Sequence, residues 1–208
     1  MITEYFFTLS CLFLTHQILK FIPLLSQSTQ YYIIHIIINS IVVIFSWKNL
    51  TEIFVSPLRI GISENDNYVT VPSMIVLLLH IYHTIFFQLY KIEYIHHGLM
   101  MSLLLYPILN IKYLPMTNSM LFFTSGLPGL LIYSSLVLYK IGLISKETHN
   151  YIDRKINLYL RSPGILFTIF IIYIRYIYNI YDDLRIVIIV STLLFWNAQY
   201  FTDLSFRI

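Results

Sequence analysis

Long apolar stretches alternate with short polar ones along almost the whole chain. Each apolar stretch approaches the length of a bilayer-spanning helix, for which roughly 20 predominantly apolar residues suffice. A spanning segment must satisfy its backbone hydrogen bonds internally, which favours α-helices. We therefore predict an all-α polytopic membrane protein with about seven transmembrane helices. They comprise residues 5–25, 31–47, 71–90, 94–109, 116–139, 163–181 and 184–201.

The polar connections predict how these helices pair. Only three residues, 91–93, separate the third helix from the fourth, and the short segment 182–184 joins the last two, so each pair should form an antiparallel hairpin. Residues 48–72 and 140–164 are longer and more polar, as is typical of loops. Because neither polar block is long enough to fold separately, we predict a single transmembrane domain over residues 1–208.

Composition supports the bilayer as the natural solvent. Hydrophobic residues make up 58% of the chain and charged residues only 11%, whereas about a quarter of residues are charged in soluble domains. The net charge of +3 includes no basic run of the kind that binds nucleic acid. A single cysteine, Cys11, excludes an internal disulfide framework. The expected partners are membrane lipids, with self-association through membrane helices as a further possibility.

The distribution of basic residues predicts an orientation. Short loops rich in Lys and Arg favour the cytoplasmic side. Five basic residues follow the fifth helix: Lys140, Lys146, Arg154, Lys155 and Arg161. With seven crossings this segment shares a side with the C-terminus, so we expect a cytosolic C-terminus and an N-terminus on the opposite side.

Residues 145–161 have the pattern of an amphipathic surface helix. Apolar positions such as Ile152 and Ile156 recur at helical spacing, against polar positions such as Asp153 and Lys155. A cationic amphipathic helix of this kind lies in the headgroup layer of a membrane. We therefore predict an interfacial helix over residues 145–161.

Polar side chains within the apolar stretches are the best indicators of function, because such groups are costly at membrane depth and usually face the bundle interior. They concentrate in four helices, and the proposed topology gathers the last two groups at the cytosolic end. They are His35 and Asn39 in the second helix, His80 and His83 in the third, Glu93, His96 and His97 in the fourth, and Asn197, Gln199 and Asp203 in the seventh.

The adjacent histidines are candidates for proton transfer, because imidazole titrates near neutrality. Neighbouring helix positions are about 100° apart, so the two rings cannot face the same way. We predict the deeper His97 as the base, oriented by Asp203 or Glu93, with His96, His97 and Asp203 catalytic. Glu93, His80, His83, Asn197 and Gln199 are assigned to substrate binding. The structural alternative is that these histidines form interhelical hydrogen bonds or lie among the headgroups.

Metal binding is the other chemistry that histidines suggest. The pairs His80/His83 and His96/His97 superficially resemble the histidine boxes of membrane di-iron hydroxylases and desaturases. Those enzymes need about eight histidines in several boxes, whereas this chain has seven in all, some of them scattered. We predict no metal and no cofactor.

Four further polar or helix-breaking features have structural interpretations. Pro128, beside Gly129, predicts a kink or a close helix approach. Arg175, near the end of the sixth helix, is explained by snorkelling. Asp182 and Asp183 are interpreted as residues of a tight turn.

The segment "KIEYIHHGLMMSLLLYP" resembles the histidine-pair segment of the TLC-domain superfamily, which includes ceramide synthases and translocon-associated membrane proteins. An acidic residue followed by apolar positions and a His-His pair entering a helix is the shared pattern, matched by Glu93, His96 and His97. The C-terminal "LLFWNAQYFTDLSFRI" is similar to the last helix of that family. The resemblance covers residues 71–206, which would form a TLC-like core.

The resemblance implies a lipid-handling protein of the endoplasmic reticulum or a related membrane, with helices around a lipid cavity. An acyl chain would lie between apolar walls, with its polar head near His96 and His97. The enzymatic version is N- or O-acyl transfer with acyl-CoA as co-substrate, although the longer ceramide synthase signature is not found here. The alternatives are a non-enzymatic transporter or channel, or a structural assembly protein.

Overall fold

The computed structural model describes residues 2–23, 25–58, 69–87, 91–109 and 113–207. Within these ranges it describes the side chains of all residues except 2–5, 92, 93, 96, 103 and 106–109. The regular elements found in these ranges are all helices. They form seven continuous helical stretches, which correspond in order to the seven apolar segments of the sequence.

The first four stretches are single α-helices. Ser26 begins the second of them, because its hydroxyl oxygen accepts a hydrogen bond from the backbone N–H of Thr29 at 3.2 Å. Pro72 lies in the first turn of the third, where a missing N–H is tolerated. The bounds are α1 (Ile2–Lys20), α2 (Gln27–Val55), α3 (Val71–Phe86) and α4 (Lys91–Leu109).

The next two stretches each contain a π-helical turn immediately before a proline. One runs through α5 (Leu114–Leu121), η2 (Phe122–Gly126) and α6 (Leu127–Lys140), and the other through α7 (Lys146–Ile156), η3 (Asn157–Arg161) and α8 (Ser162–Ile177). Pro128 and Pro163 lack a backbone N–H, and their rings would clash with the carbonyl group four residues earlier. A wider turn relieves that clash without breaking the helix. The seventh stretch is α9 (Leu184–Arg207).

The predicted interfacial helix is not a separate element. Ser145 caps α7, because its hydroxyl oxygen accepts a hydrogen bond from the backbone N–H of Thr148 at 3.1 Å. However, α7 continues through η3 into α8 as one helix from Lys146 to Ile177. Residues 145–161 thus form the first half of a long helix that packs against α6 and α9.

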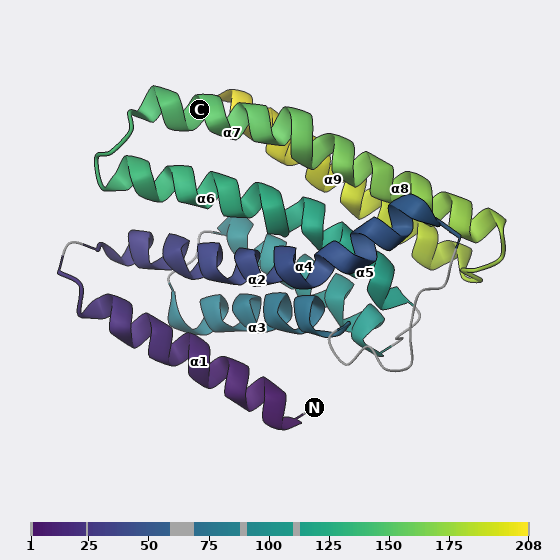
Figure 1. Ribbon diagram of the computed structural model, residues 1–208, viewed down its shortest axis with the longest axis horizontal. Coiled ribbons are helices and arrows are strands. Elements are labelled where there is room, and N and C mark those ends of the chain that lie inside the picture. The colour runs from purple at the N-terminus through teal and green to yellow at the C-terminus, as the bar shows by residue number, and fades with distance from the viewer. Residues whose placement is uncertain (1, 24, 59–68, 88–90, 110–112, 208) are drawn as a thin grey trace.

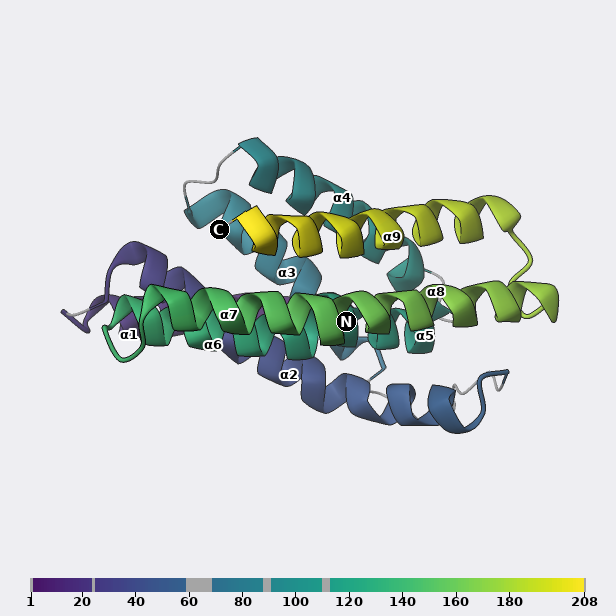
Figure 2. The same cartoon turned by 90° about the horizontal axis from the view of Figure 1, so that it is seen from above.

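Consecutive helical stretches run in alternating directions. The α1–α2 and α6–α7 connections lie at one end of the molecule and the α8–α9 connection lies at the other (Figure 1). The C-terminus lies toward the first of these ends, and the N-terminus lies near the middle of the long axis. The helix α2 is central, with α3 and α6 packed against it and α1 outside α3. Seen from above, α9 lies beside the continuous α7–α8 helix (Figure 2).

The distribution of side chains is that of a protein in an apolar solvent. Large apolar residues such as Phe7, Phe170 and Phe195 are exposed on the outside, whereas the polar residues Asn39 and Thr168 are buried. Four helices in the described ranges are long and apolar enough to cross a membrane: α2, α5 to α6, α7 to α8, and α9. This is compatible with an integral membrane protein. The count of seven crossings stays a prediction, because α3 has only 16 residues.

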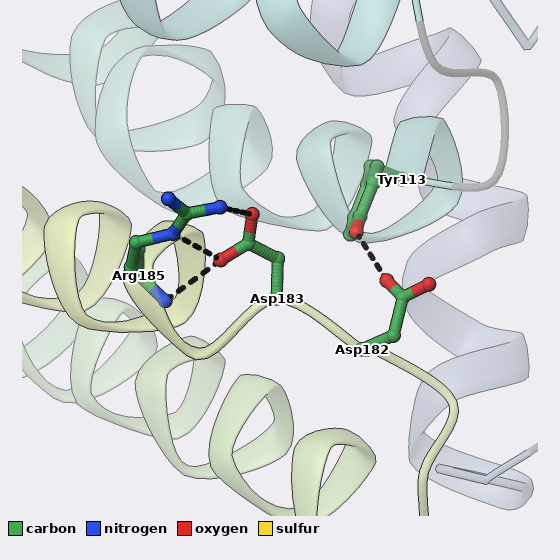
Figure 3. Close-up of polar contacts among 4 residues, drawn as sticks. All are labelled: Tyr113, Asp182, Asp183 and Arg185. Atoms are coloured by element: carbon green, nitrogen blue, oxygen red, sulfur yellow. Dashed lines mark hydrogen bonds and ion pairs between the residues drawn. The ribbon is translucent and has the colours of Figure 1, made fainter.

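The turn between α8 and α9 gives its two aspartates separate structural roles. Asp183 accepts hydrogen bonds from the backbone N–H and the guanidinium group of Arg185, at 2.9 to 3.3 Å, and so caps the start of α9 (Figure 3). These bonds hold the pKa of Asp183 below its ordinary value. Asp182 instead accepts a long hydrogen bond of 3.4 Å from the hydroxyl group of Tyr113.

Candidate functional site

A cavity of about 250 Å³ lies in the half of the bundle that contains the α6–α7 connection. Residues from α2, α3, α4, η2, α6, α7, η3 and α9 line it. We call it the polar cavity, because several of its lining side chains are polar and buried although the surrounding helices are apolar. From α2, α3 and α9 they are His35, Asn39, His80 and Asn197.

The continuous α7–η3 helix contributes a polar stripe to the same cavity. Its members are His149, Asp153, Asn157 and Arg161, each four residues after the last, so that they share one helix face. The Asn157 amide nitrogen donates to Asp153 Oδ1 at 2.8 Å, and Arg161 Nη1 donates to Asn157 Oδ1 at 2.7 Å. The amide therefore lies between the carboxylate and the guanidinium group and fixes the orientation of both.

Four histidines cluster on the α3 side of the polar cavity. The ring centroids of His35 and His83 are 4.6 Å apart, those of His83 and His97 5.9 Å, and those of His80 and His97 4.7 Å. Of these four, His35 and His80 line the cavity. His83 is fully buried, and neither of its ring nitrogens has a hydrogen-bond partner among the described residues. Burying a polar group without a hydrogen-bond partner costs free energy. The cluster is therefore a candidate for a functional role.

Hydrogen bonds fix the tautomers of two cavity histidines in their neutral forms. His80 Nδ1 lies 2.7 Å from the carbonyl oxygen of Val76, which can only accept, so Nδ1 carries the proton. The hydroxyl group of Ser135 donates to the carbonyl oxygen of Ile132 and therefore accepts from His149 Nδ1 at 2.8 Å. Both rings thus keep the Nε2 lone pair, so each can accept a proton.

Glycine keeps α6 close to α2 at the cavity wall. A Cβ atom added at Gly129 would lie 2.5 Å from Asn39 Nδ2, which is shorter than side chains tolerate. This is the close helix approach that the Gly and Pro residues of this segment predict. Asn39 is buried, and its amide nitrogen has no hydrogen-bond partner in the described part of the chain.

A second, apolar pocket of about 210 Å³ lies between α4, α5, α8 and α9. Most of its lining side chains are aliphatic or Met, with Met116, Ile172 and Val190 among them, and the tilted rings of Tyr113 and Tyr181, 4.8 Å apart, also belong to its lining. We call it the apolar pocket. It is lined by residues from the half of the bundle toward the α8–α9 connection, away from the polar stripe.

A small space of about 20 Å³, which we call the neck, lies between the two cavities. The neck shares Leu99, Met120 and Leu193 with the apolar pocket. It shares Met100, Thr124 and Asn197 with the polar cavity. The three spaces therefore follow one another along the bundle, with a polar end and an apolar end.

The structure brings together only part of the site predicted from sequence. His80, His83 and His97 meet in the histidine cluster, with His97 against the ring of His80 and 3.5 Å from the hydroxyl oxygen of Thr84. Asn197 lines the neck and the polar cavity. His97 is buried beside His80, whereas the histidines that line the cavity are His35, His80 and His149.

The remaining predicted residues lie elsewhere or outside the described part. Asp203 is exposed and forms an ion pair with Arg207 at 2.6 Å, so its carboxylate is directed to a surface cation rather than to His97. Gln199 is exposed on α9. The side chains of Glu93 and His96 lie outside the described residues.

Sequence reasoning assigned no site role to the polar stripe or to His35. The positions of Asp153, Asn157 and Arg161 were attributed to a headgroup-facing surface, because the pattern of an interfacial helix and that of a helix with a buried polar face are the same. The signal that separates them is chemical. A carboxylate, an amide and a guanidinium group at intervals of four can bond to one another, as they do here.

The described residues contain no group of three or more His, Cys, Asp or Glu side chains arranged to hold a metal ion. The four clustered imidazoles contact one another as tilted, stacked or edge-to-face rings, and Nδ1 of His80 donates to the carbonyl oxygen of Val76. No family model, curated protein or solved structure matches this chain significantly.

Proposed function

We propose that this protein binds a single-chain lipid inside the membrane, with the acyl chain in the apolar pocket and the head group in the polar cavity. The observation that carries the proposal is the order of the three spaces, from an aliphatic pocket through the neck to a cavity lined by buried polar groups. Ligand pockets are typically apolar with a few convergent polar groups that fix orientation. A molecule with one apolar and one polar end matches that arrangement.

The size of the neck restricts the ligand to one chain. Its volume of about 20 Å³ holds roughly one water-sized group. Two acyl chains side by side would not pass it. A head group reaching the polar cavity would meet the histidine cluster through His80, which agrees with the expected place of a polar head near the histidines.

The same assignment fits the resemblance to TLC-domain proteins, and with it an endomembrane location such as the endoplasmic reticulum. In the catalytic version of the proposal, an amine or hydroxyl group bound in the polar cavity attacks the thioester carbonyl of acyl-CoA. The new C–N or C–O bond replaces the C–S bond, and CoA leaves as the thiol with the proton taken from the acceptor. His80 or His149 would remove the acceptor's proton, because each ring keeps a lone pair on Nε2. In the binding version the same groups hold the head group and orient the lipid.

Blocking the neck tests lipid binding directly. Leu193 is partly exposed and lines both the neck and the apolar pocket, so Leu193→Trp should fill the passage while the helix remains folded. Native mass spectrometry of protein purified in a mild detergent should show one bound single-chain lipid in the wild type and none in the variant.

The matched control is Ile188→Trp, which adds the same side chain to the exposed face of the same helix. It should retain the lipid. Equal lipid content in both variants, with both melting like the wild type, would remove the basis of the proposal. Incubation of the purified protein with acyl-CoA and sphingoid or glycerol acceptors then separates the catalytic version from the binding version.

A further inference from the structure

We infer that the polar cavity selects a lipid with an anionic head group, a carboxylate or a phosphate, which Arg161 binds. This inference rests on the proposed lipid binding and adds the charge of the head group. Arg161 lines the cavity and is only 7% exposed. Its position on a π-helical turn directs it, with Asn157, toward the same space.

The guanidinium group of Arg161 has spare hydrogen-bonding capacity. Its one hydrogen bond within the described residues is the 2.7 Å bond from Nη1 to Asn157 Oδ1. The buried Nε has no hydrogen-bond partner there. The face of the group lies 4.6 Å from the ring centroid of Phe201, so the stacking holds its plane in place.

The charge of Arg161 is not neutralised by direct contact. Asp153 is the acidic residue among the described residues that line the cavity, and the Asn157 amide separates it from Arg161. Buried charges are normally paired, and the arginine fork matches the oxygens of a carboxylate or phosphate. An anion in the cavity supplies the missing partner.

A second unpartnered donor lines the same cavity. Asn39 is 2% exposed, and its amide nitrogen has no hydrogen-bond partner in the described ranges. The unpartnered groups of the described lining include two donors, Arg161 Nε and Asn39 Nδ2, and one acceptor, Asn197 Oδ1. The positive charge of Arg161, rather than the number of donors, therefore favours an anionic head group. An ammonium head group would leave both donors unpaired and would add a second positive charge.

The two tryptophans of the chain, Trp47 and Trp196, allow a direct measurement. Trp196 lines the neck and is 41% exposed, and replacing Trp47 by Phe leaves Trp196 as the only tryptophan. Because probe dissolved in the detergent also reaches the exposed part of Trp196, the signal of binding is the quenching that saturates. Brominated alkyl chains quench tryptophan fluorescence on contact. The probes are a brominated fatty acid, alkyl phosphate, fatty alcohol and alkylamine of equal chain length, added to the full chain in neutral detergent at about pH 8, well above the pKa of an ordinary carboxyl group.

The fatty acid, the alkyl phosphate or both should quench Trp196 saturably, at about tenfold lower concentration than the alcohol. The amine should bind most weakly. A hydrogen bond to a charged group contributes enough free energy for this tenfold difference in affinity. Which of the two binds more tightly identifies the anion. Arg161→Gln should lower the affinity for the anionic probe about tenfold and leave that for the alcohol unchanged, while Arg161→Lys should retain part of it. Lys155→Gln, which removes one charge from the exposed face of the same helix, should have no effect.

Each outcome decides one of the two proposals. If none of the four probes quenches saturably, lipid binding itself fails, and this inference fails with it. If the alcohol or the amine binds as tightly as the anions, or if Arg161→Gln weakens the alcohol equally, lipid binding stands but selection of an anionic head group is overturned.

Discussion

At the scale of single residues, glycine decides how closely the helices approach. A Cβ atom at Gly164 would overlap the ring of Phe123, whereas one at Gly98 would meet nothing within 4 Å. Gly164→Ala should therefore lower the free energy of unfolding by about 1–3 kcal/mol through overpacking. Gly98→Ala should leave it unchanged or raise it slightly, because alanine favours a helix. Chemical denaturation in detergent measures both, and equal stability of the two variants would show that Phe123 moves freely.

A buried amide has a comparable role between α2 and α5. The side-chain nitrogen of Asn118 donates to Asn49 Oδ1 at 2.7 Å and to the carbonyl oxygen of Val69 at 2.8 Å. We predict that Asn118→Leu destabilises the protein by about 1–3 kcal/mol, because both acceptors would remain buried without a donor. Gln199→Leu, on the exposed face of α9, should have little effect in the same denaturation experiment.

The burial of polar residues was only partly predictable from sequence. The predicted antiparallel hairpin of the third and fourth helices brings the helix of His80 and His83 beside that of His97, and the three rings lie in one cluster. The pairing of Asp203 with Arg207 was predictable from sequence but was not used, since Arg207 lies one helical turn away on the same helix. Local spacing favours such a pair over a contact between distant helices.

At the scale of helices, the polar face of α7 and η3 is turned inward. Labelling of single cysteines in a Cys11→Ser background tests this. Lys155→Cys, on the exposed face, should react readily with a maleimide. Asn157→Cys, at a position only 2% exposed, should react more slowly by a factor of about ten or more. Equal rates would instead support the surface helix that the sequence pattern suggests.

The positions of the helices were predictable from sequence, but the continuity of α7 with α8 was not. The seven helical stretches follow the apolar segments, because hydrophobicity and polar connections determine them directly. The sequence indicated a break before Pro163, since proline usually ends or kinks a helix. The π-helical turn η3 absorbs the proline and keeps α7 and α8 in one helix, and no spacing rule applied to one sequence anticipates that.

At the scale of the whole molecule, consecutive helical stretches run in alternating directions (Figure 1). If every helical stretch crosses the membrane, tags at the two termini should lie on opposite sides. We expect protease digestion of intact vesicles to remove a C-terminal tag from the cytosolic side, together with sites in the basic α6–α7 connection, and to spare an N-terminal tag. Both tags on one side would require an even number of crossings and would contradict the seven-helix topology.

The π-helical turn η3 has a consequence for variation in chain length. A π-helical turn holds one residue more than an α-helical turn of the same span, so deleting one residue from η3 should restore ordinary helical winding. Because both forms of the turn cover the same span, such a deletion would leave α7 and α8 in the same mutual orientation and keep His149 and Asp153 at the cavity. Loss of a single codon between Asn157 and Arg161 would thus shorten the spacing of these two residues without altering the fold.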